Sequence, residues 1–98
     1  MKFIIHTKDG GEEVDVKAYL KFITVDGVKF KMILHRPLFE ESYKSWDITD
    51  YRTGMSAGSV GSDYRTMKDA LEETARRIKQ IGIQEFVRVT GKYKTLNK

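Results

Sequence analysis

The chain has 98 residues, of which 33% are charged and 40% hydrophobic, with a formal net charge of +4 and no cysteine. This length is typical of one domain, and the hydrophobic content is enough for a thin core, so a disordered chain is not expected. The lack of cysteine excludes disulfides and thiolate metal sites, and the positive charge disfavours a mimic of DNA.

The N-terminal residues predict a short first strand over residues 3–7, stopped by Asp9-Gly10-Gly11. Two glycines after an aspartate favour a turn, because glycine accepts a positive φ without steric cost. The apolar run at residues 3–5 is too short for a signal peptide, which needs about 7–15 apolar residues, or for a membrane helix of about 20. We therefore expect a cytoplasmic protein with no membrane partner.

A hairpin is predicted over residues 14–35. Residues 14–25 alternate in polarity, as in a strand with one buried face. Asp26-Gly27 follows, which is a strong signal for a two-residue hairpin turn. The side chains expected to face the core are Val14, Val16, Ala18, Leu20 and Phe22, and then Val28, Phe30, Met32 and Leu34 on the return strand. The opposite face would carry Lys17, Tyr19, Lys21, Ile23, Lys29, Lys31, Ile33 and His35.

Pro37 ends the return strand because proline cannot donate to the ladder. A polar connection follows, and alternation over residues 46–51 predicts a fourth strand that begins at Trp46. A turn at residues 52–54 leads to a weaker fifth strand over residues 55–60, whose small side chains suit the edge of a sheet.

Residues 66–82 contain the signals for both ends of a helix. Thr66 and Asp69 have the spacing of a capping box, and Gly82 stands where a helix takes a left-handed residue after its last turn. Between them, apolar side chains recur at helical spacing and form one stripe that can pack on the sheet. A further short helical turn is expected over residues 84–89.

These elements predict an α+β fold, namely an antiparallel β-meander of four to five strands packed on one C-terminal helix. Residues 1–90 would form a single domain. Residues 91–98 would form a frayed basic tail, because termini are ordered only where something holds them.

The second half of the chain resembles small accessory proteins of Gram-positive phages and prophages. In these proteins a tryptophan strand and a Thr-Gly turn precede a glycine-containing strand and a capped helix. The matching residues are Trp46-Asp47-Ile48-Thr49-Asp50, Thr53-Gly54, Thr66, Asp69-Ala70-Leu71, Ala75, Gly82 and Glu85-Phe86. The resemblance implies a phage or prophage setting and carries over no catalytic residue.

One candidate site is a basic face of the predicted sheet. Lysines beside an aromatic ring suit nucleic acid, because the cations neutralise phosphates and the ring stacks on a base. The candidate nucleic-acid-binding residues are Lys17, Tyr19, Lys21, Lys29, Lys31 and His35. The alternative is a solvated lysine face that keeps the protein soluble and discourages pairing of strand edges.

A second candidate site is a surplus of apolar side chains beyond what one inner face needs. Such a surplus suggests contact with another copy or with a host protein. The candidate protein-interaction residues are Ile23, Ile33, Phe39, Tyr43 and Tyr51. The alternative is that the connection after the hairpin folds back and buries them.

Enzyme chemistry has little support in the sequence. His6 and His35 are the only histidines, and neither lies in a metal-ligating or nucleophile-activating pattern. We therefore predict no catalytic, metal or cofactor residues. The expected function is a non-enzymatic binding module, as a homodimer or a modulator of a host protein, with nucleic-acid binding as the alternative.

Overall fold

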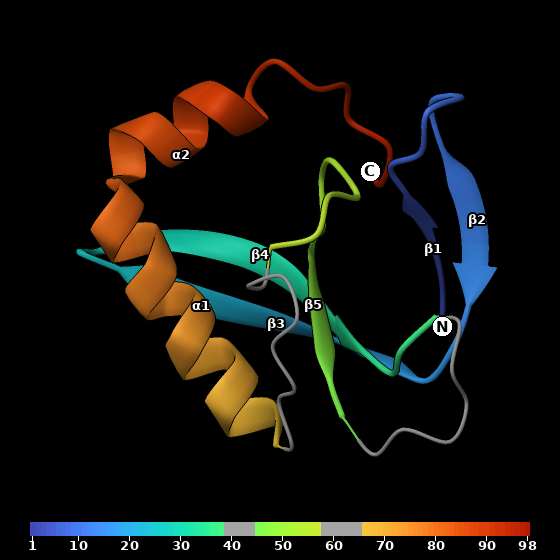
Figure 1. The fold of residues 1–98 in the computed structure, drawn as a ribbon, viewed down its shortest axis with the longest axis horizontal. Coiled ribbons are helices and arrows are strands. Elements are labelled where there is room, and N and C mark those ends of the chain that lie inside the picture. The colour runs from blue at the N-terminus through green and yellow to red at the C-terminus, as the bar shows by residue number, and fades with distance from the viewer. Residues whose placement is uncertain (39–44, 58–65) are drawn as a thin grey trace.

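The structure, a computed structural model, describes residues 1–38, 45–57 and 66–98. The predicted α+β class is confirmed, since five antiparallel strands precede two helices. The strands divide into two sheets instead of one continuous meander (Figure 1). One helix packs on one face of the larger sheet, and the smaller sheet lies at the far end of that sheet from the helices.

The elements have the following bounds. The smaller sheet pairs β1 (Lys2–Ile5) with β2 (Glu12–Asp15). The larger sheet has the order β3 (Ala18–Val25), β4 (Val28–His35), β5 (Asp47–Asp50). The helices are α1 (Met67–Ile81) and α2 (Ile83–Thr90).

The stretch predicted as one long strand over residues 14–25 is divided between the two sheets. β2 ends at Asp15 and β3 begins at Ala18, so Val16 and Lys17 carry the chain from one sheet to the other. Alternation of polarity continues through this bend, because each half still has one face toward protein and one toward solvent. The sequence pattern therefore predicted the extended conformation correctly but did not reveal the bend between β2 and β3.

The predicted hairpin turn is confirmed. Asp26 and Gly27 have φ values of 49° and 83°, and two positive φ values are what a type I′ turn requires. The turn pairs Val25 with Val28, and the register continues to Ala18 opposite His35.

This register decides which side chains face α1. Paired residues lie on the same face of a sheet, so odd-numbered residues of β3 share a face with even-numbered residues of β4. Ile23 and Val25 accordingly lie in the core with Met32 and Leu34. We call the opposite side of the three-stranded sheet the outer face. The prediction that Leu20 and Phe22 point into the core is wrong, because the register places them on this outer face.

The predicted start and end signals of the helix are confirmed at both ends of α1. The Thr66 hydroxyl accepts a hydrogen bond from the Asp69 amide at 3.0 Å, and α1 begins at the next residue after Thr66. At the other end, the Gly82 amide donates to the Ile78 carbonyl at 2.9 Å. Gly82 has the expected positive φ of 97°, but its ψ of 132° is extended, so the chain turns and α2 starts at once.

The predicted fifth strand is only a short contact within the described residues. Ser56 forms an isolated bridge with Thr49. The Asp50 amide donates to the Met55 carbonyl at 2.8 Å, and the Ala57 amide donates to the Ile48 carbonyl at 3.0 Å. Residues 58–60 of that prediction lie outside the described residues. Residues 55–57 thus cover the free edge of β5.

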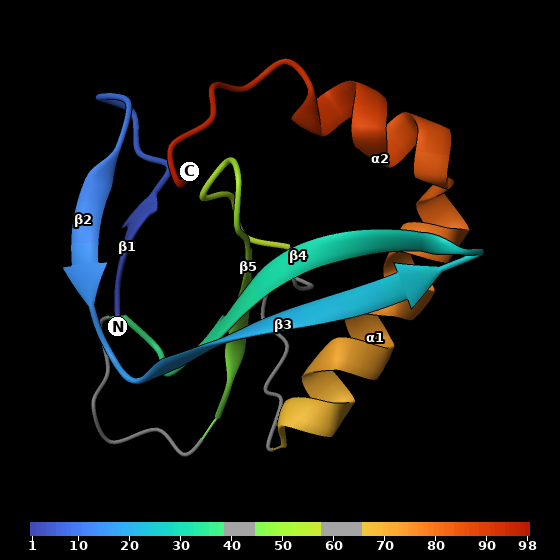
Figure 2. The same cartoon turned by 180° about the vertical axis from the view of Figure 1, so that it is seen from behind.

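The C-terminal tail is bound to the sheets, and the prediction that it frays is wrong. The Asn97 side chain accepts from the Ile4 amide and donates to the carbonyls of Ile4 and Tyr51, each at 2.8 Å. The Leu96 amide also donates to the Arg52 carbonyl at 2.7 Å. Figures 1 and 2 both show the C-terminus beside β1. An amide side chain that mimics a strand backbone was not recognisable in the sequence.

Candidate functional surface

The outer face of the three-stranded sheet is buried at the end where β1 lies. Ile33, His35 and Thr49 share this end of the face, and none is more than 4% exposed. Phe3 of β1 packs on His35 with 5.1 Å between ring centroids. We call this region the covered half.

The same face is open toward the Asp26-Gly27 turn. Phe22 is 62% exposed and Leu20 is 43% exposed, and Lys31 lies directly opposite Phe22 on β4. The Lys31 ammonium lies 3.9 Å from the centroid of the Tyr51 ring, in a cation–π contact. Figure 2 views this side of the sheet, with β3 and β4 in front of α1. We call the surface formed by Leu20, Phe22, Thr24, Lys29 and Lys31 the open half.

The structure does not bring the six predicted nucleic-acid-binding residues together. Lys29 and Lys31 lie on the outer face, whereas Tyr19 and Lys21 pair with Leu34 and Met32 and so lie on the side of α1. Lys17 lies in the bend before β3, and His35 is buried. The prediction of one shared basic face is therefore wrong, because the two-residue turn places odd-numbered residues of β3 and of β4 on opposite faces.

His35 is a structural residue with both ring nitrogens occupied. Nδ1 donates to the Arg36 carbonyl at 2.9 Å, and Nε2 accepts from the Thr49 hydroxyl at 2.7 Å. Burial lowers the pKa of His35 below the usual value of about 6.5, against the opposing effects of the Arg36 carbonyl and the Asp47 carboxylate. The neutral ring is thus held in place, with no nitrogen available to bind phosphate or to transfer a proton.

The predicted protein-interaction residues are also separated by the structure. Ile23 and Ile33 are 5% and 0% exposed, so they are core residues and that part of the prediction is wrong. Tyr51 is half-buried and its hydroxyl donates to the Lys98 carbonyl at 2.9 Å. Phe39 and Tyr43 lie outside the described residues.

Sequence reasoning missed Leu20 and Phe22 as surface residues, although the signal was present. A two-residue turn pairs the residues on either side of it, here Val25 and Val28, and paired residues share a face. If Phe30 and Met32 point inward on β4, then Ile23 must point inward on β3 and Phe22 must point outward.

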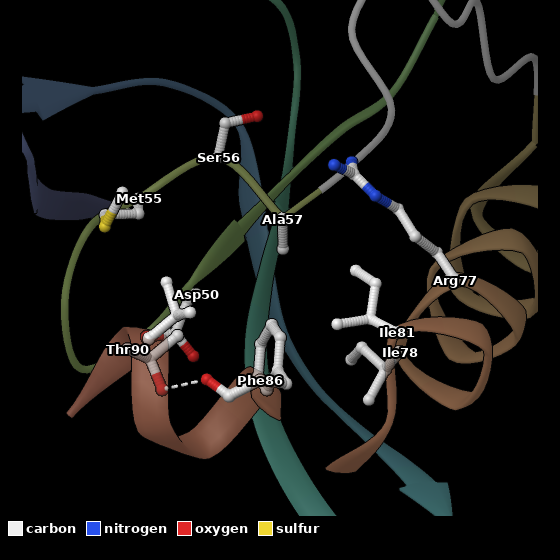
Figure 3. A pocket seen from close by; sticks show the side chains of 10 residues that line it. Asp50, Met55, Ser56, Ala57, Arg77, Ile78, Ile81, Phe86 and Thr90 are labelled. Carbon is white, nitrogen blue, oxygen red and sulfur yellow. Dashed lines mark hydrogen bonds between the residues drawn. The ribbon is translucent and has the colours of Figure 1, made fainter. Parts of the chain in front are cut away.

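A small cleft lies between the two helices and residues 55–57 (Figure 3). Its volume is about 180 Å³, and its wall is mainly apolar, with Ile78 and Ile81 on α1 at one side and Phe86 on α2 at another. Drug-sized ligands occupy pockets of about 300–1,000 Å³. The cleft is therefore smaller than the pockets that hold drug-sized ligands, and a more open hollow of about 430 Å³ adjoins it at Asp50, Phe86 and Thr90.

The described residues include no group of three or more His, Asp or Glu side chains that could hold a metal ion. Within the same residues, neither helix has the length and apolarity needed to cross a bilayer. Comparison of the chain with protein-family models, curated proteins and solved structures finds no match.

Proposed function

We propose that this protein is a non-enzymatic binding module that acts through protein–protein contact at the open half of the outer face. The observation that carries the proposal is the exposure of Phe22. At 62% it is the most exposed of the large hydrophobic side chains that the structure describes. Burying a phenylalanine in an interface contributes about 1.5–3 kcal/mol relative to leaving it in water, so Phe22 is suited to be an interface anchor.

The charges around Phe22 indicate the chemistry of the partner. Lys31 lies opposite Phe22, and Lys29 lies opposite Thr24 one step nearer the turn. An apolar side chain with two lysines along one side fits a partner surface that has an apolar patch beside carboxylates. Such complementarity mainly raises the association rate and selects the partner.

The resemblance to phage and prophage accessory proteins favours a phage- or prophage-encoded module. In that setting the partner would be a host protein or a second copy of the chain. No reaction is required of the module, because occupying a surface is enough to modulate a host protein.

Site-specific photo-crosslinking tests the proposal. A photo-reactive phenylalanine analogue at position 22 is expected to give discrete crosslinks that excess wild-type protein suppresses and excess Phe22→Ser does not. The matched control carries the same analogue at Val87, which is 51% exposed on α2. The proposal fails if position 22 gives no crosslink, or gives the same products as position 87.

Nucleic acid is the second candidate partner. The sequence predicted Tyr19 as the aromatic residue beside the lysines of the outer face, and in the structure Phe22 has that position. Phe22 shares the outer face with Lys29 and Lys31, and a ring among cations can stack on the bases of a single strand. Fluorescence polarisation with single- and double-stranded oligonucleotides at low salt tests this alternative. Binding that Phe22→Ser and Lys29→Ala both weaken would favour it, and absence of binding at low salt would eliminate it.

A further inference from the structure

Within the described residues, β3 has an open backbone edge. It is an eight-residue strand at the end of the sheet order β3-β4-β5. In an antiparallel pair, hydrogen-bonded and non-hydrogen-bonded residue pairs alternate, and the two residues that flank a two-residue turn form a hydrogen-bonded pair. Counting from Val25 and Val28, the backbone groups that point away from β4 are those of Ala18, Leu20, Phe22 and Thr24.

A hydrogen bond on the other side of β4 supports this assignment. Lys31 lies opposite Phe22 in the register, so its carbonyl must point away from β3. That carbonyl accepts from the Tyr51 amide at 3.1 Å, on the side of β5. The turn therefore determines which backbone groups of β3 point outward, and the hydrogen bond between Tyr51 and Lys31 agrees with that assignment.

The other strand edges in the described part of the chain are protected. Residues 55–57 cover β5 through the hydrogen bonds of Asp50 and Ile48. The Asn97 side chain occupies both backbone groups of Ile4 on β1. β2 has only four residues, three of them acidic, and a short charged strand resists further pairing. Among described residues, no backbone or side-chain partner is found for the outward groups of β3.

We propose that β3 pairs antiparallel with β3 of a second copy, joining the two sheets into one of six strands. The proposal rests on the proposed function and names a second copy as the partner at the edge of β3, while the lysines of β4 stay outside this contact and remain free for a surface with carboxylates. An outward row of amides and carbonyls is complementary to itself when turned by a two-fold axis, so the same strand satisfies both partners. Figure 2 shows β3 as the outermost strand of the sheet, with α1 passing behind it.

The side chains select the register. Pairing centred on Phe22 places Phe22 opposite the partner's Phe22, and places Leu20 opposite the partner's Thr24. All side chains of the open half on β3 then meet on one face, and the two phenyl rings pack together at the axis. Pairing centred on Lys21 would instead set two ammonium groups directly opposite each other, which is unfavourable.

Edge pairing therefore accounts for two features with one contact. The exposed Leu20 and Phe22 become an apolar cluster across the axis, and the open edge of β3 becomes an interior pair of strands. Lys29 and Lys31 lie on β4, one strand further from the axis, so they remain available at the border of the new surface.

Light scattering with a proline variant tests the backbone contact. Thr24→Pro removes an outward amide and leaves the hydrogen bonds between β3 and β4 intact, since proline is tolerated where the missing donor faced solvent. The wild type and the matched Thr24→Ala variant are expected to have twice the chain mass. Thr24→Pro is expected to have the mass of one chain, with an unchanged circular dichroism spectrum.

Cysteine variants test the register without depending on the proline. The chain has no cysteine, so each variant carries a single thiol. In a hydrogen-bonded antiparallel pair the two Cα atoms lie about 5.5 Å apart, which a disulfide can span. A mixture of Leu20→Cys and Thr24→Cys, which keeps Phe22 at the axis, is expected to form the mixed disulfide rapidly in mild oxidant, and Lys21→Cys to form its own dimer much more slowly. Equal rates, or a faster reaction for Lys21→Cys, would overturn the Phe22-centred register.

The outcomes separate this inference from the proposed function. A wild-type protein that stays monomeric up to about 1 mM, where even weak pairs associate, overturns the dimer. If position 22 still crosslinks to another protein, the proposed function survives that result. A dimer that persists in Thr24→Pro overturns the edge pairing, and the loss of both dimer and crosslink overturns both proposals.

Discussion

Leu20 and Ile33 lie opposite each other on neighbouring strands and on the same face of one sheet, yet their surroundings differ. Ile33 is fully buried, whereas Leu20 is 43% exposed. Ile33 belongs to the covered half, beside Phe3 and His35, and Leu20 belongs to the open half. The difference comes from segments far away in sequence, namely β1, whose Phe3 packs on His35 at one end of the face, and the C-terminal tail, which holds β1 through Asn97. Local pattern sets the face of a strand, and distant packing decides whether that face is a core or a surface.

The largest effect is expected where the covered half is closed. A Cβ at Gly54 would lie 2.5 Å from the Ile4 carbonyl oxygen and 2.8 Å from the His6 amide nitrogen, and Gly54 has a φ of +72°. Because backbone would have to move, Gly54→Ala should lower the free energy of unfolding by about 3 kcal/mol or more. Gly27→Ala is the control, with a φ of +83° and open space around it, and should cost only about 1 kcal/mol. Urea titrations of both variants give the comparison, and equal losses would contradict it.

Alanine variants of the opposed residues Leu20 and Ile33 compare the two halves of the outer face directly. Ile33→Ala should destabilise the protein by about 2–5 kcal/mol, because it leaves a cavity in a closed region. Leu20→Ala should cost less than about 1 kcal/mol in the monomer, since much of that side chain is already in water. Denaturation at a protein concentration below any self-association is the measurement. A Leu20→Ala loss as large as that of Ile33→Ala would show that the open half is covered as well.

The smallest effect is expected in the pH dependence of stability, through the buried His35 of the covered half. The pKa of His35 is lowered in the fold, so the unfolded chain binds more protons below about pH 6.5. The stabilisation by neutral His35 is therefore complete above that pH and is lost as the pH falls below it. His35→Gln should remove this part of the pH dependence in urea titrations, while His6→Gln, at an exposed site, should retain it. An unchanged pH dependence in His35→Gln would mean that another group is responsible.

Much of the local structure could be predicted from the sequence. Asp26-Gly27 defined the hairpin, and Thr66 and Gly82 defined the ends of α1, because turns and caps depend on a few neighbouring residues. The candidate surface was harder to predict. Tyr19 and Lys21 were expected on the outer face, and Leu20 and Phe22 in the core, since alternation separates two faces without saying which of them is buried.

By itself the sequence determined the fold class, the hairpin turn and, through the parity of a two-residue turn, the pairing of odd with even residues across it. Only the tertiary structure decided that the strands form two sheets, that the tail is fastened by Asn97 and that the outer face is closed at one end. The physical reason is the distance along the chain over which each interaction acts. Turns and helix caps are satisfied by neighbours in the chain, whereas burial of Ile33 and exposure of Phe22 depend on where β1 and the C-terminus come to rest.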